Sequence, residues 1–114
     1  MVAEGLDGDP TTEEQVGSAA VGLEVLRYHC LRRLTARANG RPAGPESSID
    51  KLLMTQAEQH LVDCAGSLLG GRSLASNEDG WFDRYIFARA GSIYGGSSQI
   101  QKNIIARRLL ELPR

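Results

Sequence analysis

Aromatic residues, cysteines and long apolar runs are all scarce in this chain of 114 residues. Phe, Trp and Tyr make up 5% of it, which suits a helical core of Leu, Ile, Val and Ala better than a β-sandwich. No stretch approaches the roughly 18 consecutive apolar residues of a membrane span, and the first residues lack the features of a signal peptide. We therefore expect a cytoplasmic protein with no membrane partner, in which Cys30 and Cys64 are free thiols.

A large excess of charge is missing as well, since the formal net charge is −1. Residues 1–17 carry five acids and no base, whereas residues 71–114 carry seven bases and four acids. The basic part can contact an anionic ligand, but its charge density is far below that of a nucleic-acid-binding domain, so we expect no nucleic-acid partner. The length and the 41% hydrophobic content fit one domain with a single modest core.

The apolar pattern predicts an all-α fold. Apolar residues recur at steps of three and four without the alternation typical of strands, and Gly and Pro interrupt the pattern. We predict a loose tail over residues 1–11 and one helical domain over residues 12–114, an up-and-down bundle of two long and two short antiparallel helices. The helices are expected from Thr12 to about Asn39, from Pro45 to Gly70, from Trp81 to about Ser92, and from Ser97 or Ser98 to about Glu111.

Helix ends and helix faces follow from the same pattern. Thr11 or Thr12 is expected to cap the first helix, Gly70-Gly71 to stop the second before a polar loop over residues 71–80, and Ser98 with Gln101 to form a capping box. The first, second and last helices should each turn one apolar stripe toward the core. These stripes comprise Val16, Ala20, Leu23, Leu26, Cys30, Leu31 and Leu34; Ile49, Leu52, Leu53, Ala57, His60, Leu61, Cys64 and Leu68; and Ile100, Ile104, Ile105, Leu109 and Leu112.

The most informative stretch is residues 94–99, which read YGGSSQ. Adjacent glycines let a backbone approach a ligand closely or adopt positive φ, and a helix start offers free N–H groups and the positive end of the helix dipole. The stretch therefore predicts an anion or phosphate contact. A tight turn between two helices, which needs glycine for its geometry alone, explains the same residues. It is not a P-loop, because no Gly-Lys-Ser/Thr follows.

His60 and Cys64 lie four residues apart and so share a helix face. Such a pair suggests a metal site or an activated thiol. Because no third or fourth ligand stands at a suitable spacing, we predict no metal, and a buried thiol beside a partly buried imidazole. The sequence shows no paired carboxylates, Ser-His-Asp set or Cys-x-x-Cys motif that would indicate a catalytic centre.

Two runs of residues carry a resemblance to a known family. Residues 89–114 read RAGSIYGGSSQIQKNIIARRLLELPR, and residues 44–52 read GPESSIDKL. The first run resembles the C-terminal signature of acyl-CoA dehydrogenases, and the second resembles the segment between two long helices in the same family. The likeness covers about residues 9–114. It implies that the chain is the C-terminal helical domain of such an enzyme, without the N-terminal helical domain and the middle β-domain.

The resemblance also implies a flavoenzyme function. Family members remove two hydrogens from the Cα–Cβ bond of an acyl-CoA thioester: a carboxylate takes the α proton, FAD accepts a hydride from Cβ, and the electrons pass to an electron-transfer flavoprotein. The resemblance places Gly95, Gly96, Ser97 and Gln99 against the ADP part of FAD, and Tyr94 near the acyl thioester. It further implies a homo-oligomer, or a hetero-oligomer with another acyl-CoA dehydrogenase chain.

Gly95 departs from the family pattern, because one branch of the family has its catalytic Glu at this position. Gly95 has no side chain and cannot take a proton, and no other residue of the chain can be nominated as the base. We therefore expect a fragment or a partner-dependent subunit that is inactive alone. The alternatives are a non-catalytic helical oligomerisation module that docks onto a full-length homologue, and an unrelated four-helix bundle with a chance Gly-Gly turn.

Overall fold

The computed structural model describes residues 9–77 and 79–113. These residues form four helices and no strand: α1 (Pro10–Ala38), α2 (Ser47–Ser76), α3 (Trp81–Ala90) and α4 (Ser98–Arg108). The predicted all-α fold with two long and two short helices is confirmed. Most of the predicted tail, residues 1–8, lies outside the described residues. No described helix is both long and apolar enough to cross a membrane.

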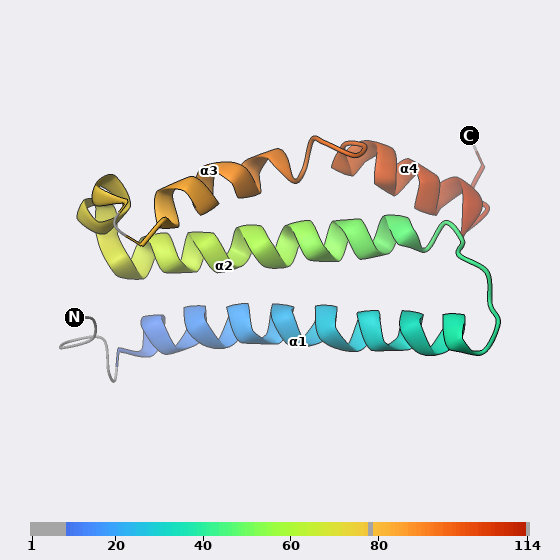
Figure 1. Cartoon of the computed structure of the whole chain (residues 1–114), viewed down its shortest axis with the longest axis horizontal. Coiled ribbons are helices and arrows are strands. Elements are labelled where there is room, and N and C mark those ends of the chain that lie inside the picture. The colour runs from blue at the N-terminus through green and yellow to red at the C-terminus, as the bar shows by residue number, and fades with distance from the viewer. Residues whose placement is uncertain (1–8, 78, 114) are drawn as a thin grey trace.

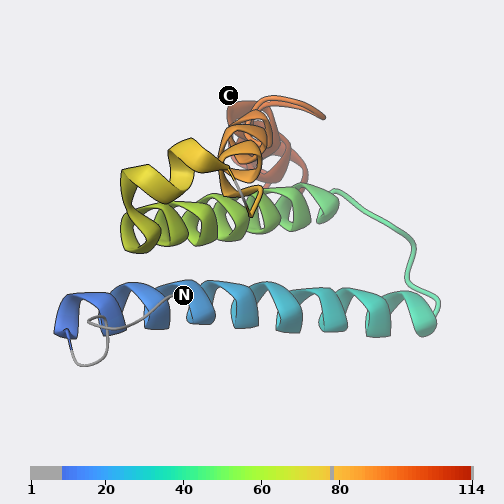
Figure 2. The ribbon, with the colours of Figure 1, turned by 60° about the vertical axis from the view of Figure 1, so that its left-hand side comes forward.

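The middle layer of the molecule is α2 (Figure 1). α1 runs antiparallel to it on one side, and α3 and α4 follow each other along its other side, as the rotated view in Figure 2 also shows. α2 contacts each of the other helices, whereas α1 contacts neither α3 nor α4 within the described ranges. The connections from α1 to α2 and from α2 to α3 reverse the chain, as expected. The connection from α3 to α4 does not: these two helices run in the same direction, with a corner between them.

The N-terminus of α1 is fixed by the residue before its proline. The Asp9 carboxylate accepts a hydrogen bond from the Thr12 N–H at 3.0 Å and caps the helix. Pro10 takes the first helical position, where its missing N–H costs nothing. The predicted cap at Thr11 or Thr12 is therefore wrong, and the helix begins two residues earlier than expected.

The C-terminal part of α2 bends at Gly70, which has a φ of 73°. Glycine tolerates this left-handed conformation, so the expected break occurs there. The chain then continues as helix to Ser76, so the polar loop expected over residues 71–80 is wrong for its first part. Asn77 ends this segment, and its side-chain oxygen accepts a hydrogen bond from the Asp83 N–H at 3.4 Å. The bent segment thereby joins the first turn of α3.

Most of the apolar stripe predicted for α1 is not covered by α2. The less exposed positions of α1 follow a different line, and α2 is the helix that covers them: Thr12, Gln15, Ala19, Gly22, Leu26, His29, Arg33 and Ala36. Of the predicted stripe, Leu26 belongs to this line, whereas Val16, Leu23 and Leu34 are exposed. The prediction also fails for Ile100 and Leu112, which are exposed at α4 and just after it.

The core is thin and made mostly of small side chains. Its buried apolar residues are Ala19, Ala57, Val62, Cys64 and Ala88. The molecule measures 50 × 26 × 25 Å, and its radius of gyration is 17.4 Å, against about 13 Å for a compact domain of this length. Three layers one helix thick leave most large apolar side chains without a covering layer.

A polar cluster fastens α1 to the start of α2. His29 Nε2 lies 2.6 Å from Asp50 Oδ1, and Arg33 Nε donates to Asp50 Oδ2 at 3.3 Å. The side chains of His29 and Arg33 are only 9% and 12% exposed. Neither residue stands out in the sequence, because their partner is 21 and 17 residues away. Asp50 is thus the acceptor on which two largely buried donors depend.

We expect Asp50→Ala to lower the free energy of unfolding by about 1–3 kcal/mol, because it leaves the His29 and Arg33 donors unsatisfied. Urea denaturation followed by circular dichroism measures this loss. Glu24→Ala is the matched control: Glu24 forms an exposed pair with Arg27 at 3.1 Å, and its removal should cost less than about 1 kcal/mol. Equal losses in the two variants would contradict the role given to Asp50.

Candidate functional site

The residues predicted to contact a cofactor lie together at the corner between α3 and α4. Gly95 and Gly96 have φ values of 64° and 94°, in a region that favours glycine. Gly95 is exposed, Ser97 is half-buried, and Gln99 is exposed on the first turn of α4. A backbone segment without side chains is therefore open to solvent where the sequence predicts a close approach to a ligand.

Two side chains hold the carbonyl groups of this corner. Lys51 Nζ, in the second turn of α2, donates to the Gly96 carbonyl at 2.6 Å. Gln101 Nε2 donates to the Gly95 carbonyl at 2.9 Å, from a side chain that is largely buried. These bonds fix the glycine pair in one conformation and bring an ammonium group beside it. Lys51 was missed as a site residue, although it falls in residues 44–52, because its partner lies 45 residues away.

The start of α4 uses several of its own backbone amides. Ser97 Oγ accepts from the Ile100 N–H at 3.3 Å, and the Ser97 carbonyl accepts from the Gln101 N–H at 2.9 Å. The Ser98 N–H donates to the Ser92 carbonyl at 3.0 Å. The capping box predicted for Ser98 and Gln101 is therefore wrong, and these three amides are not the free donors expected. Ligand binding at this corner would rest on the glycine backbone and on side chains.

Tyr94 adds an aromatic face to the corner. Tyr94 is 46% exposed. The centroid of its ring lies 6.2 Å from the ring centroid of Phe87 and 5.6 Å from Lys51 Nζ. An ammonium group at this distance is attracted to the ring. The corner thus combines bare backbone, a flat apolar surface and a positive charge. Residues 91–101 contain no Asp or Glu, so this segment supplies no proton-accepting carboxylate.

The His60 and Cys64 pair does not form a site. Cys64 is buried, as predicted, but His60 is exposed, so the expected partly buried imidazole is wrong. Cys30 and Cys64 are both free thiols, and Cys30 is exposed. Within the residues that the structure describes, no group of three or more His, Cys, Asp and Glu side chains could hold a metal ion.

Comparison with known protein families shows to which family this helical domain belongs. A family profile described as "Acyl-CoA dehydrogenase, C-terminal domain" matches residues 5–110. The chain belongs to the acyl-CoA dehydrogenase family. The match covers all four helices, so the corner at Gly95-Gly96 is part of an acyl-CoA dehydrogenase C-terminal domain.

Curated acyl-CoA dehydrogenases are similar over nearly the whole chain. Acyl-CoA dehydrogenase IpdE1 of Mycobacterium tuberculosis is 37% identical over 109 residues, which is 93% of this chain and 28% of that protein. Acyl-CoA dehydrogenase IpdE1 of Mycolicibacterium smegmatis is 35% identical over 113 residues, which is 96% of this chain and 28% of that protein. This chain therefore spans just over a quarter of the length of these relatives. No solved structure matches it.

The two glycines should differ in how they tolerate a side chain. Gly95→Ala and Gly96→Ala both force alanine into positive φ, at a cost of about 1–2 kcal/mol. A Cβ at Gly95 would meet only the Lys51 side chain, at 3.8 Å, whereas a Cβ at Gly96 would lie 2.6 Å from Gln101 Nε2 and displace it. We expect Gly96→Ala to be less stable than Gly95→Ala by roughly one hydrogen bond, about 1 kcal/mol, in urea denaturation. A larger loss in Gly95→Ala would contradict this geometry.

Proposed function

We propose that this chain is the C-terminal domain of an FAD-dependent acyl-CoA dehydrogenase and that the corner at Gly95-Gly96 contacts the cofactor. The backbone of Gly95 and Gly96, together with Ser97 and Gln99, would lie against the ADP part of FAD. Tyr94 would lie near the acyl thioester. The observation that carries the proposal is the positive-φ glycine pair, with Gly95 exposed and Gly96 half-buried, whose carbonyl groups are held by Lys51 and Gln101.

The corner fits such a cofactor. The carbonyl groups of both glycines are occupied by protein donors, so the open side of the corner is not lined by unpaired acceptors that would repel a phosphate. The Lys51 ammonium contributes a positive charge next to that side, where it attracts an anionic ligand. When bound, FAD would supply the hydride acceptor for oxidation of an acyl-CoA at its Cα–Cβ bond.

This chain contributes binding surface rather than proton transfer. Gly95 has no side chain, and residues 91–101 contain no carboxylate, so a base that removes the α proton must come from outside this corner. A single wall of a binding site gives weak affinity, because the remaining contacts and their preorganisation are missing. We therefore propose that activity needs an acyl-CoA dehydrogenase partner chain or the remaining domains. Acyl-CoA, an electron-transfer flavoprotein and a cytoplasmic location belong to the same proposal.

Flavin retention tests this function directly. We expect the chain, co-expressed with a full-length homologue, to co-purify with it and to raise the flavin absorbance per mole of complex. Gly96→Val should abolish this added flavin and leave the helix content nearly intact. Gly40→Val is the matched control, because Gly40 also has a positive φ of 79° and has open space around it. Normal flavin binding by Gly96→Val, or equal losses in the two variants, would refute the cofactor contact.

A second function, a helical module that docks onto a full-length homologue without catalysis, is favoured by the outer faces of α1. Seven large apolar side chains on this helix are exposed: Val16, Val21, Leu23, Val25, Tyr28, Leu31 and Leu34. Two of them, Val16 and Leu23, line an apolar groove of about 320 Å³ between α1 and α2, with Leu61 and Leu68 on its α2 side. Apolar surface of this extent is typical of an interface.

Introducing negative charge on this face tests the docking function. We expect the double variant Leu23→Glu, Leu34→Glu to weaken association at least tenfold, because each carboxylate would have to be desolvated in an apolar interface. Sedimentation velocity and co-purification with the full-length homologue measure the association. Ser18→Glu adds the same kind of charge at an exposed polar position of α1 and should leave it unchanged. A complex that forms normally but gains no flavin from this chain favours this function over the first, and a double variant that associates normally refutes it.

A further inference from the structure

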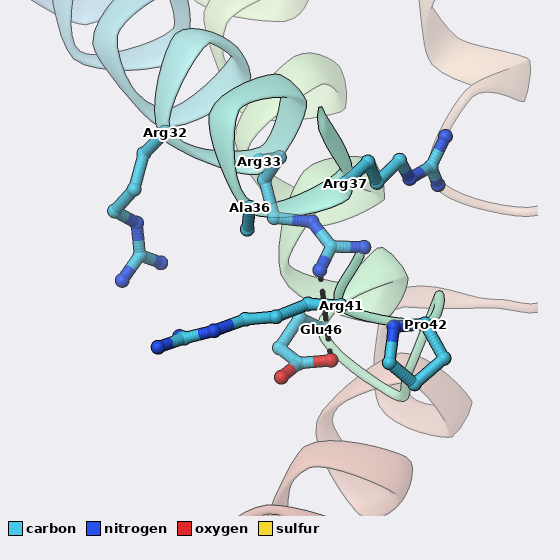
Figure 3. Close-up of a pocket in the computed structure, with 7 residues that line it drawn as sticks. All are labelled: Arg32, Arg33, Ala36, Arg37, Arg41, Pro42 and Glu46. Carbon is cyan, nitrogen blue, oxygen red and sulfur yellow. Dashed lines mark ion pairs between the residues drawn. The ribbon is translucent and has the colours of Figure 1, made fainter. Parts of the chain in front are cut away.

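An arginine-rich pocket lies where α1 ends and residues 41–46 lead into α2 (Figure 3). It encloses about 180 Å³, and its charged lining consists of four arginines and one carboxylate: Arg32, Arg33, Arg37, Arg41 and Glu46. Figure 3 shows Arg32 and Arg41 extending to the same side of the Arg33–Glu46 ion pair, while Arg37 extends to the other side. Arg32 and Arg41 also line the adjoining hollow.

The positive charge of this pocket is only partly neutralised. Arg33 takes up both nearby carboxylates, Glu46 at 3.6 Å and Asp50 at 3.3 Å. The other three arginines make no ion pair with any described residue. Arg37 lies in the last turn of α1, where the negative end of the helix dipole stabilises its positive charge. Arg32 and Arg41 remain as two uncompensated guanidinium groups on one side of the pocket.

Arg33 forms part of the pocket wall and is held there by the two carboxylates. Its Nε and Nη1 face Asp50 and Glu46, whereas its Nη2 is buried and has no hydrogen-bond partner among the described residues. Figure 3 shows this Nη2 on the Arg37 side of the ion pair, away from Arg32 and Arg41, so Arg33 contributes positive charge to their side of the pocket but no free donor.

The size and the donor type of the pocket select the ligand. The pocket is smaller than the roughly 300–1,000 Å³ of sites that enclose a whole ligand. At about 30 Å³ per water molecule, it has room for a tetrahedral oxyanion and some water. Guanidinium groups match phosphate oxygens in a paired geometry. We propose that this pocket binds a phosphate group between Arg32 and Arg41, either as inorganic phosphate or as the terminal phosphate of a larger metabolite.

Titration of the isotope-labelled chain with sodium phosphate tests the site. At constant ionic strength, so that screening of exposed charges does not change, we expect saturable one-to-one binding with a Kd of about 1 mM or tighter. The arginine Nε–H resonances should shift with the same Kd. Adenosine monophosphate forms a second titration: equal affinity identifies the phosphate group as the whole ligand, and tighter binding identifies it as the end of a larger one. Acetate should bind at least tenfold more weakly than phosphate.

Charge-removing variants locate the binding. The double variant Arg32→Gln, Arg41→Gln should weaken phosphate binding at least tenfold, whereas Glu46→Gln should tighten it several-fold by removing the carboxylate that faces the anion. Arg27→Gln is the matched control, because this exposed arginine of α1 does not line the pocket. Circular dichroism checks that each variant keeps its helix content. Linear, unsaturable shifts, equal binding of acetate, or equal losses in Arg27→Gln and the double variant would overturn the proposal.

Discussion

Two adjacent residues near the start of α2 connect the two outer layers of the molecule. Asp50 accepts hydrogen bonds from His29 and Arg33 of α1, and Lys51 donates to the Gly96 carbonyl at the corner between α3 and α4. Because α1 contacts neither α3 nor α4 within the described ranges, α2 is what relates the outer layers. The position of the glycine corner relative to α1 is therefore set by contacts within the first two turns of one helix.

The thin core explains why a single domain of this family presents so much apolar surface. Small buried residues such as Ala57 and Ala88 let helices pack closely, but they bury little area each. Many of the larger apolar side chains of α1 and α3 then remain at the surface. Both proposed functions are consistent with this exposed apolar surface. A corner that forms only one wall of a cofactor site needs further protein to complete the site, and a helical docking face needs a partner to cover it. The hydrogen bonds of Asp50 and Lys51 hold the three layers in place, because the burial of small apolar side chains alone would bind the layers weakly.

The sequence predicts the helices better than it predicts their faces. Periodic apolar residues indicate four helices, and glycine marks the break at Gly70 and the corner at Gly95-Gly96, because these are local properties of the chain. The side of α1 that meets α2 depends on long-range contacts, and here Ala19 and His29 are covered while Leu23 is exposed. The clustering of the predicted site residues could be predicted, since they are neighbours in sequence. The contribution of Lys51 depends on how α2 packs and has no local signal.

The conformation of the corner bears on the missing base. With a φ of 64° and only the Lys51 side chain near its added Cβ, at 3.8 Å, Gly95 occupies a position where a longer side chain would be strained but not excluded. A carboxylate introduced there would lie near the Lys51 ammonium, and ion pairing lowers the basicity of a carboxylate. Lys51 holds the Gly96 carbonyl, so it cannot move away without loosening the corner. The contact that holds the glycine backbone in place thus also makes this corner a poor place for a base, which agrees with the binding role proposed for Gly95 and with the proposal that the base lies elsewhere in an assembled enzyme.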